Sequence, residues 1–476
     1  MRNRKYSSGL DFAVRCFIVV FCAFVASAEA GRAKRPNVVM IISDDQTFTD
    51  FGFMGNTKVQ TPHLDRLASQ SARFVNGYVP TSVCSPSLAT LLTGLYPHQH
   101  KIHFNHPPPG NSAFNRMTDR AEYERIRSRS FALIRNQWTL PRALAEEGYR
   151  CLQTGKYWEG HYTNAGFTDG MTRFQPVPGQ DFGGNRTFAS GKIAAHGNGD
   201  WGLKIGRETM QPIEDFVDQC GSDQPFFIWY APYLPHEPHN SPKKFYDLYQ
   251  GERSVPEHLH PYYASCSEFD ASVGKLVKLI EDKGLAEETL FVFVVDNGWT
   301  PKTTRSKRGN FQHTKESKRS PFEDGLRTPI LFRWDGVVKP ATHQGLCNSV
   351  DIMPTVLSAL GLPERPSLPG TDLLPASKGK SRWNNDTVFG EIYPGDASVL
   401  RNPSKDIAYR WIRQGDHKLI TVHKHGEKDA WGDYLKTDAL YDLSKDPKEK
   451  TNLIKTPQHQ KRVQAMRAKL NNWWKP

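Results

Sequence analysis

The chain has 476 residues, which is long enough for one large domain and a smaller one. Hydrophobic residues make up 38% and charged residues 24%, which is typical of a globular protein and excludes wholly disordered classes. The net charge of +12 favours anionic partners, although a solvated basic surface without any partner is an equal alternative. The basic runs SKRG and SKRS are too short to indicate nucleic-acid binding, so we expect no nucleic-acid partner.

The N-terminus has the features of a secretory signal peptide, over residues 1–28. Basic residues at positions 2, 4 and 5 precede the apolar stretch FIVVFCAFVASA, which starts at Phe17 and is too short to span a bilayer. Ala26-Ser27-Ala28 or Ala28-Glu29-Ala30 fits the small-x-small rule for cleavage. We therefore expect a periplasmic or secreted protein with no stable membrane anchor. An uncleaved anchor is the alternative.

The cysteines after the signal peptide are odd in number. In an oxidising compartment at least one of them stays unpaired. None has the spacing of a zinc site. Because of its sequence context, Cys84 is the candidate for the unpaired one. The five cysteines are Cys84, Cys151, Cys220, Cys266 and Cys347.

Apolar runs and helical patterns alternate along the first three quarters of the chain. Four continuous apolar runs predict strands buried on both faces of a sheet: residues 37–42, 225–231, 290–295 and 328–334. Helical patterns lie between them, at residues 63–74, 139–149 and 262–284. This alternation predicts an α/β domain over residues 36–375, with a large mixed, mostly parallel sheet flanked by helices.

The composition changes near residue 376, where a polar, loop-like stretch begins. Short strands joined by turns are predicted at residues 386–392, 409–422 and 439–447, followed by an amphipathic helix at 458–474. We therefore expect a smaller C-terminal subdomain of antiparallel strands and a helix, over residues 376–476.

Polar side chains follow three of the predicted strands. Asp44 and Asp45 follow the first, His236 the second, and Asp296 and Asn297 the third. Ligands of such sheets gather at the carboxyl ends of the strands, although each pair alone is also an ordinary turn signal. Oxygen donors without a nearby Cys/His set favour Ca²⁺ or Mg²⁺ over zinc. Crowded carboxylates also repel one another unless a cation lies between them.

Cys84 lies at the start of a predicted helix. Pro86 suits the first helical position, and Gly94 suits the residue that ends the helix. A helix N-terminus favours anions, lowers the pKa of a cysteine placed there, and exposes it to ligands. The alternative is that Cys84 is a small buried hydrophobic residue.

Three further side chains are candidates for catalysis. Lys156 follows a short strand-like segment and a glycine, and Lys318 lies in ESKRSPFEDGLRTP. His236, at a strand end, suits a general acid or a donor to an anionic oxygen. Each also has an ordinary alternative, since most lysines and loop histidines are simply exposed.

Blocks spread across the mature chain resemble the type I sulfatases of the alkaline-phosphatase-like superfamily. Their order along the chain makes the resemblance specific, because some of the blocks are weak on their own. They include PNVVMIISDDQ, CSPSLATLLTGLYPHQH, LPRALAEEGYRCLQTGKY, PHEPH, LFVFVVDNGW, KRSPFEDGLRTPILFRW and LYDLSKDPKEKTNL.

The resemblance implies hydrolysis of sulfate esters. It implies that a formylglycine-generating or equivalent maturation enzyme oxidises Cys84, and that one oxygen of the hydrated aldehyde attacks sulfur. It also implies one divalent cation, usually calcium, that holds the sulfate. The implied metal ligands are Asp44, Asp45, Cys84, Asp296 and Asn297. The implied catalytic residues are Cys84, Lys156, His236 and Lys318.

Two positions depart from the family pattern. Leu88 stands where the motif C-x-P-x-R has arginine, and it continues an apolar helix face with Leu91 and Leu92. Trp158 stands where the family has a histidine two residues after the lysine. His161, three residues further on, is the candidate to replace that histidine in binding substrate.

We expect a sulfatase that acts on a sulfated carbohydrate. Two alternatives stay open. One is a catalytically inactive protein that binds sulfated glycans in a retained cleft. The other is a phosphate or phosphonate ester hydrolase of the same superfamily.

Overall fold

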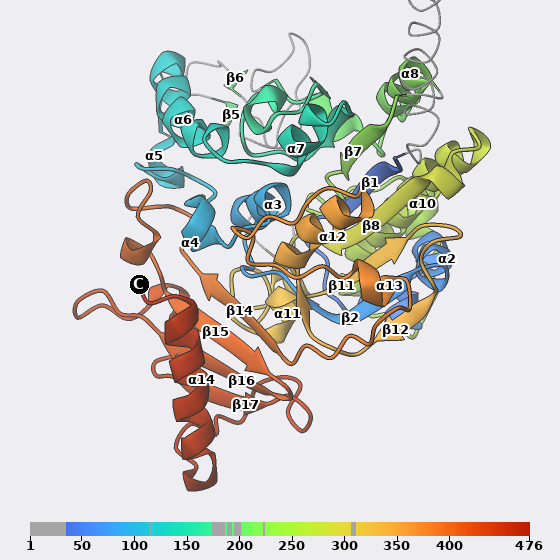
Figure 1. Cartoon of the computed structure of the whole chain (residues 1–476). Coiled ribbons are helices and arrows are strands. Elements are labelled where there is room, and N and C mark those ends of the chain that lie inside the picture. The colour runs from blue at the N-terminus through green and yellow to red at the C-terminus, as the bar shows by residue number, and fades with distance from the viewer. Residues whose placement is uncertain are drawn as a thin grey trace, which may run out of the picture. The chain divides into compact units, whose positions relative to one another are not determined.

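A mixed sheet of nine strands forms the centre of the computed structural model (Figure 1). The structure describes residues 35–114, 116–117, 119–173, 186–187, 193–194, 201–221, 224–305 and 311–476, so the predicted signal peptide lies outside the described residues. The spatial order of the strands is β12-β2-β11-β8-β1-β7-β3-β4, with β13 also paired to β2. Their bounds are β1 Asn37–Ser43, β2 Ala72–Tyr78, β3 Arg150–Gly155, β4 Asp169–Gly170, β7 Phe226–Ala231, β8 Thr289–Val295, β11 Arg327–Arg333, β12 Ala341–His343 and β13 Cys347–Asn348.

The central strands of this sheet are parallel. β1 runs parallel to both β7 and β8, and β3 runs parallel to β7 and β4. β11 is the exception, since it pairs antiparallel with β8 on one side and with β2 on the other. The predicted fold class, a large mixed and mostly parallel sheet, is confirmed.

Helices cover both faces of the sheet. The longer ones are α2 Pro62–Ser69, α3 Cys84–Thr93, α6 Arg120–Arg135, α7 Leu140–Glu146, α8 Gln211–Cys220, α10 His260–Asp282, α12 Ile352–Ala359 and α14 Gln460–Trp473. Single-turn helices are α4 Pro97–His100, α5 Asn111–Phe114, α9 Lys243–Tyr246, α11 Glu323–Leu326 and α13 Leu374–Ser377. None of the described helices is both long enough and apolar enough to cross a bilayer.

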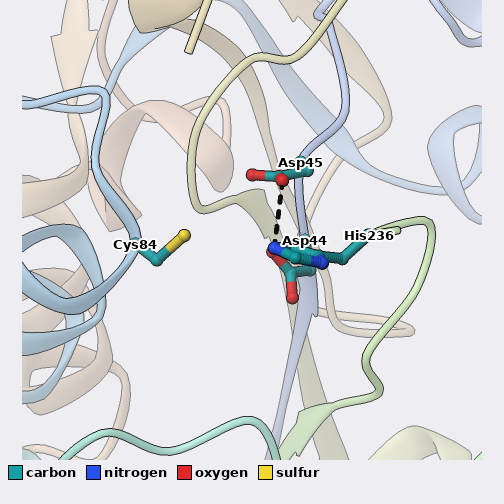
Figure 2. Close-up of side chains that lie close together, drawn as sticks. All are labelled: Asp44, Asp45, Cys84 and His236. Carbon is teal, nitrogen blue, oxygen red and sulfur yellow. Dashed lines mark ion pairs between the residues drawn. The ribbon is translucent and has the colours of Figure 1, made fainter. Parts of the chain in front are cut away.

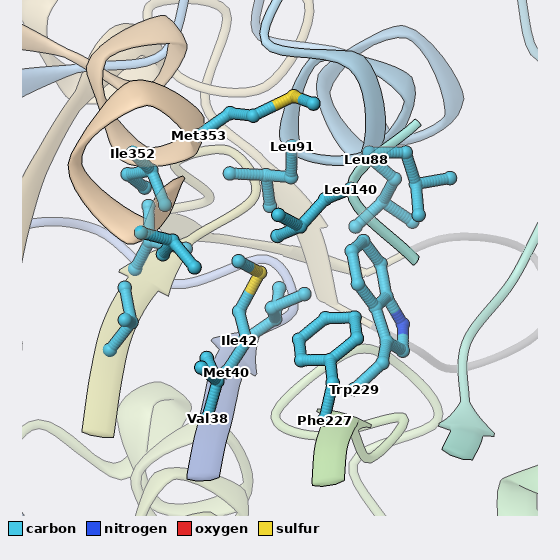
Figure 3. Close-up of a cluster of buried hydrophobic side chains, with 14 of the residues drawn as sticks. Val38, Met40, Ile42, Leu88, Leu91, Leu140, Phe227, Trp229, Ile352 and Met353 are labelled. Atoms are coloured by element: carbon cyan, nitrogen blue, oxygen red, sulfur yellow. The ribbon is translucent and has the colours of Figure 1, made fainter. Parts of the chain in front are cut away.

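Alternate residues of β1 belong to two separate cores. Val38 and Met40 pack with side chains of α3, α7 and α12 on one face, as Figure 3 shows. Val39 and Ile41 pack with α2, α8 and α10 on the other. Because side chains alternate across a strand and both faces are covered, β1 needs apolar residues throughout.

The predicted helix over residues 63–74 is wrong at its C-terminal end. α2 ends at Ser69, and residues 72–74 begin β2, in the interior of the sheet. Ala72 and Phe74 are buried while Arg73 between them is half-buried, so the local period is that of a strand.

A second sheet forms the C-terminal part of the structure (Figure 1). Its strands are antiparallel in the order β14 Thr387–Ile392, β15 Tyr409–Gln414, β16 His417–Val422 and β17 Ala439–Asp442. Helix α14 packs Met466 and Leu470 against Ile412 and Leu419 of this sheet. Two hairpins complete the described strands: β5 Arg186–Thr187 with β6 Ile193–Ala194, and β9 Pro301–Arg305 with β10 Phe311–His313.

The boundary predicted near residue 376 falls inside α13. Ala376 packs within the core of the large sheet, and the loop that enters β14 begins only after α13 ends at Ser377. Residues 37–476 form one compact unit. The division of the chain at residue 376 stays a prediction.

Candidate active site

The acidic pairs that follow β1 and β8 lie side by side at one edge of the sheet. β1 and β8 are parallel neighbours, and Ser43 lies opposite Val295 at their carboxyl ends. The backbone N–H of Asp296 donates to the carbonyl of Ser43, at 2.9 Å, so the pairing continues one residue beyond the strands. The parallel register therefore carries both acidic pairs to the same place.

Asp45 is held from several sides. Its backbone φ is 61°, in the left-handed region that non-glycine residues rarely occupy. Its backbone N–H donates to Asp296 Oδ1 at 3.0 Å, and Asn297 Nδ2 donates to Asp45 Oδ1 at 2.7 Å. Asp44, Asp45, Asp296 and Asn297 are all buried.

Lys156 enters this acidic group from the end of β3. Gly155 precedes it with φ 73°, and a Cβ there would lie 1.9 Å from the carbonyl oxygen of Ala231, so only glycine fits. Lys156 Nζ lies 2.5 Å from Asp44 Oδ1 and 3.2 Å from Asp296 Oδ2. Burial alone would lower the pKa of Lys156, but Asp296 and Asp44 hold it well above its usual value. Lys156 is therefore a buried cation.

Lys318 and His236 both contact Asp45. Lys318 Nζ lies 2.6 Å and His236 Nε2 3.3 Å from Asp45 Oδ2, the latter pair joined by the dashed line in Figure 2. His236 stacks on Tyr233, with 4.3 Å between ring centroids. Burial would raise the pKa of Asp45, but the charge of Lys318, with that of Lys156, outweighs it and lowers the pKa. Burial holds the pKa of His236 well below its usual value, so its ring is neutral near pH 7.

Cys84 is the first residue of α3, and its sulfur points toward the carboxylates in Figure 2. Ligand atoms of Cys84, Asp44, Asp45 and His236 all lie within 4.8 Å of one another. The expectation of an exposed cysteine with a lowered pKa is wrong. Cys84 is only 1% exposed, and burial raises the pKa of its thiol to about 11 although Lys156 and Lys318 act to lower it.

Helix α3 differs from the prediction at its start and agrees with it at its end. Pro86 is the third helical residue rather than the first, because the helix already begins at Cys84. Gly94 ends it with φ 66°, as expected for a glycine after a helix. All five cysteines predicted to remain after export are free thiols in the structure.

The donor atoms at this centre fit a hard cation. Asp44 Oδ2 and Asn297 Oδ1 are buried and have no hydrogen-bond partner among the described residues. A buried oxygen without a partner is costly, and a bound cation would satisfy both atoms. Carboxylate and amide oxygens suit Ca²⁺ or Mg²⁺. Among the described residues, His236 is the only histidine grouped with these atoms.

Two positions that depart from the family motif lie in packed surroundings. Leu88 is 3% exposed and packs in the main core near Leu140 (Figure 3). Trp158 is buried, and Arg127 lies 5.9 Å from its ring centroid.

His161 does not join the group around Cys84 in the structure. Its Nδ1 lies 2.9 Å from Thr163 Oγ1, and its ring packs on Tyr162. It also precedes a short 3-10 helix, Tyr162–Ala165, whose first turn it caps. Substrate binding by His161 stays a prediction.

Sequence reasoning missed two side chains near this centre. Tyr233 lies under Lys156, with 5.8 Å between Nζ and the ring centroid. Burial lowers the pKa of His313, on β10, and the charge of Lys318 lowers it further. Tyr233 lies just after β7, at the same strand end as His236, so its position in the sequence could have predicted that it lies at this centre. Nothing in the local sequence of His313 distinguishes it.

The fold and the site together define an α/β protein with a buried cysteine, carboxylates and lysines at the carboxyl ends of parallel strands. A sequence profile described as "Sulfatase" matches residues 36–362. A second, described as "N-sulphoglucosamine sulphohydrolase, C-terminal", matches residues 312–475. The chain belongs to the type I sulfatase family, within the alkaline-phosphatase-like superfamily, and is a sulfuric ester hydrolase.

Curated relatives cover most of the chain. Arylsulfatase A of Homo sapiens is 30% identical over 480 residues, which cover 92% of this chain and 89% of that protein. N-acetylgalactosamine-6-sulfatase of Canis lupus familiaris is 27% identical, covering 88% and 82%. The ulvan-active sulfatase of Formosa agariphila is 24% identical, covering 93% and 80%.

Solved structures share the fold at lower identity. Ps i-CgsB superposes with a TM-score of 0.65 at 21% identity, covering 92% of this chain and 93% of that one. BT4656, solved with its substrate D-glucosamine-2-N,6-O-disulfate, superposes with a TM-score of 0.64 at 18% identity, covering 92% of this chain and 97% of that one. The phosphonate monoester hydrolase of Agrobacterium radiobacter superposes with a TM-score of 0.62 at 18% identity, covering 92% of this chain and 95% of that one. The fold alone therefore does not separate sulfate from phosphonate esters.

Proposed function

We propose that this chain is an exported sulfatase that removes sulfate from a sulfated carbohydrate, using a formylglycine made from Cys84 and one bound Ca²⁺. The observation that supports it most is the meeting of Cys84, two lysines and the acidic group at one buried centre. A maturation enzyme is required, because a buried thiol with a raised pKa is a poor nucleophile.

The cation and the modified residue would supply the chemistry that the unmodified chain lacks. A formylglycine at position 84 would provide a nucleophilic hydroxyl, and Ca²⁺ held by Asp44, Asp45, Asp296 and Asn297 would bind the sulfate oxygens. The two unsatisfied oxygens, Asp44 Oδ2 and Asn297 Oδ1, support this ligand set.

The lysines would bind the sulfate. Lys156 and Lys318 are fixed cations in a buried site, where they need no reorganisation when negative charge develops on the sulfuryl oxygens. Their carboxylate partners hold both side chains in place before substrate arrives. Substrate binding then requires only that the sulfate approach groups that are already oriented.

His236 would act together with Lys318 at the leaving oxygen. Its Nδ1 lies 2.7 Å from the carbonyl of Glu237, which assigns the ring proton to Nδ1. Nε2 is then free to accept from Lys318 Nζ at 3.4 Å. We propose that this pair donates the proton that the departing alcohol needs.

A carbohydrate substrate is supported by the relatives. N-acetylgalactosamine-6-sulfatase and the ulvan-active sulfatase are named for sulfated sugars, and the profile over residues 312–475 is that of a sulphoglucosamine enzyme. The basic net charge of the chain suits an anionic glycan.

Release of free sulfate tests the proposal. Protein exported from its native host is incubated with N-acetylgalactosamine 6-sulfate, N-acetylglucosamine 6-sulfate, D-glucosamine-2-N,6-O-disulfate and ulvan oligosaccharides. We expect release from at least one of them, its loss in EDTA with recovery in Ca²⁺, and its absence in Cys84→Ala and Asp45→Asn. Binding without release would indicate a glycan-binding protein. Phosphonate or phosphate ester hydrolysis that survives Cys84→Ala would indicate the other superfamily activity.

A further inference from the structure

Arg319 follows Lys318 directly, and its backbone is tied to the segment that precedes Cys84. Its N–H donates to the carbonyl of Ser82 at 2.9 Å, and Ser82 Oγ donates to the carbonyl of Ser320 at 2.7 Å. Its φ is 72°, in the left-handed region that costs energy for a residue with a Cβ. Ser82 lies two residues before Cys84. The backbone of Arg319 is therefore fixed at the edge of the catalytic centre.

The guanidinium of Arg319 carries a charge that the described residues leave unpaired. The side chain is exposed, and among the described residues it has neither an ion pair nor a hydrogen bond. This differs from its neighbour Lys318, whose charge is balanced by Asp45 at 2.6 Å.

The guanidinium faces the loop that follows β14. A Cβ added at Gly395 would lie 3.8 Å from its Cζ and Nη2 atoms. The carbonyl of Gly395 accepts from the N–H groups of Asn105 and His106, so this loop is held in place from its other side. Arg319 thus lies where the segment before Cys84 meets the C-terminal part of the chain.

The charge of Arg319 affects the pKa values of two nearby residues, His313 and Tyr434. Burial lowers the pKa of His313 the most, and the charges of Lys318 and Arg319 lower it further. Burial raises the pKa of Tyr434 to about 12, and Arg319 acts in the opposite direction. An unneutralised cation held near Lys318 is repelled by it, and an anion from the ligand would relieve that repulsion. Strained backbone positions cluster at ligand-binding and active sites, which agrees with a binding role for Arg319.

We infer that Arg319 determines specificity by binding a second anionic group, a sulfate or a carboxylate, on the sugar whose sulfate is removed at Cys84. This inference rests on the proposed function. A guanidinium binds either group through two parallel N–H···O bonds, which gives orientation as well as affinity. Substrates with two anionic groups would then be preferred over those with one.

Kinetics on a matched pair of sugars test this. The probes are D-glucosamine-2-N,6-O-disulfate and N-acetyl-D-glucosamine 6-O-sulfate. In Arg319→Gln we expect KM for the disulfate to rise about tenfold with kcat nearly unchanged, because one charge-assisted interaction with the ground state is lost. KM for the monosulfate should stay within about twofold. Arg319→Lys should recover part of the loss. An equal loss on both sugars, or no loss on either, overturns the inference.

Arg66→Gln is the matched control. Arg66 is an exposed arginine of α2 whose side chain pairs with Glu281, and it contacts none of the residues named at the site. We expect it to leave both KM values unchanged.

A binding measurement separates this inference from the proposed function. If the wild-type protein releases sulfate from neither sugar, titration calorimetry of the Cys84→Ala protein still measures Kd. Adding Arg319→Gln should weaken the Kd of the disulfate about tenfold and leave that of the monosulfate unchanged. Equal Kd values with and without Arg319, or no binding of the disulfate at all, overturn the inference.

Discussion

At position 88 helix α3 carries a leucine that packs against the main core, four residues after Cys84. Leu91, Leu140 and Trp229, which Figure 3 also draws, belong to the same core. The side chain therefore stabilises the helix that presents Cys84, and an apolar residue suits the surroundings it has in this chain.

Truncation of this leucine should destabilise the fold. We expect Leu88→Ala to lower the free energy of unfolding by about 2–5 kcal/mol, because it leaves a cavity in a close-packed core. Leu88→Met should cost less than about 1.5 kcal/mol, since it keeps the volume. Urea unfolding followed by circular dichroism measures both. Leu248→Ala, at an exposed leucine, is the control and should change little. A loss below 1 kcal/mol in Leu88→Ala would contradict this packing.

Lys156 should contribute to turnover rather than to general surface charge. We expect Lys156→Met to lower kcat by about 10²–10³, which is the usual effect of removing one fixed group that stabilises developing charge. Lys278→Met removes an exposed lysine that pairs with Asp282 on α10, and it should leave kcat unchanged. Initial rates of sulfate release on a responsive substrate measure the effect. Similar rates for the two variants would remove Lys156 from the mechanism.

Much of this centre could be predicted from single residues. Asp44, Asp45, Asp296 and Asn297 follow two apolar runs, and parallel strands bring such residues to one edge. The burial of Cys84 could not be predicted in this way, because it depends on helices and loops from distant parts of the chain. The unpaired charge of Arg319 could not be predicted for the same reason. The local sequence does not show which of the two adjacent basic residues, Lys318 or Arg319, has an acidic partner in the fold.

At the scale of elements, α10 caps the start of α2. Asp270 Oδ1 accepts from the N–H of Leu64 at 2.7 Å, and Oδ2 accepts from that of His63 at 3.2 Å. These are N–H groups of the first helical turn, which have no partner inside the helix. One buried carboxyl group of α10 therefore fixes the position of α2.

Burial of this carboxyl group should make stability depend on pH. Burial raises the pKa of Asp270 to about 7 although both N–H groups act to lower it. A raised pKa means that the stabilisation is complete below the unfolded pKa, near 4, and is lost as the pH rises through 7. Between pH 4 and 8 the wild type should lose up to about 4 kcal/mol relative to Asp270→Asn, which does not titrate. Denaturant titrations at each pH measure the difference. Parallel pH profiles for the two proteins would contradict the assignment.

The elements themselves were predictable to different degrees. Continuous apolar runs gave β1, β7, β8 and β11 within one or two residues of their ends. β2 was mistaken for the end of a helix, because its pattern is short and follows α2 after only two residues. Its place beside β11 depends on pairing between residues far apart in sequence, which local periodicity does not contain.

At the scale of the whole molecule, a buried group of charges joins the large sheet to the C-terminal sheet. Lys418 of β16 is fully buried, and its Nζ lies 3.0 Å from both Glu323 and Glu449. Glu323 also accepts from the hydroxyl of Tyr78 on β2, at 2.6 Å. Arg413 also lies 3.6 Å from Glu323, so Lys418 and Arg413 together balance two buried carboxylates at the junction of the two sheets.

Removal of the Lys418 cation should weaken the junction. We expect Lys418→Met to lower the free energy of unfolding by about 3–5 kcal/mol, because it leaves uncompensated buried charge. Adding Glu449→Gln should recover part of the loss, since one of the two carboxylates is then neutral. Lys436→Met, at an exposed lysine paired with Asp429, is the control and should change the free energy of unfolding little. Scanning calorimetry of the four proteins measures these differences. A neutral effect of Lys418→Met would contradict the role of the junction.

The central claim is that Cys84 becomes a formylglycine in this chain, with leucine in place of the arginine of the motif. Mass spectrometry of the peptide that carries Cys84, from protein exported by its native host, tests it most directly. We predict the mass of the aldehyde, and an aldehyde that reacts with a hydrazide probe. A thiol that is fully alkylated by iodoacetamide after unfolding would contradict the claim, and would leave the centre without its proposed nucleophile.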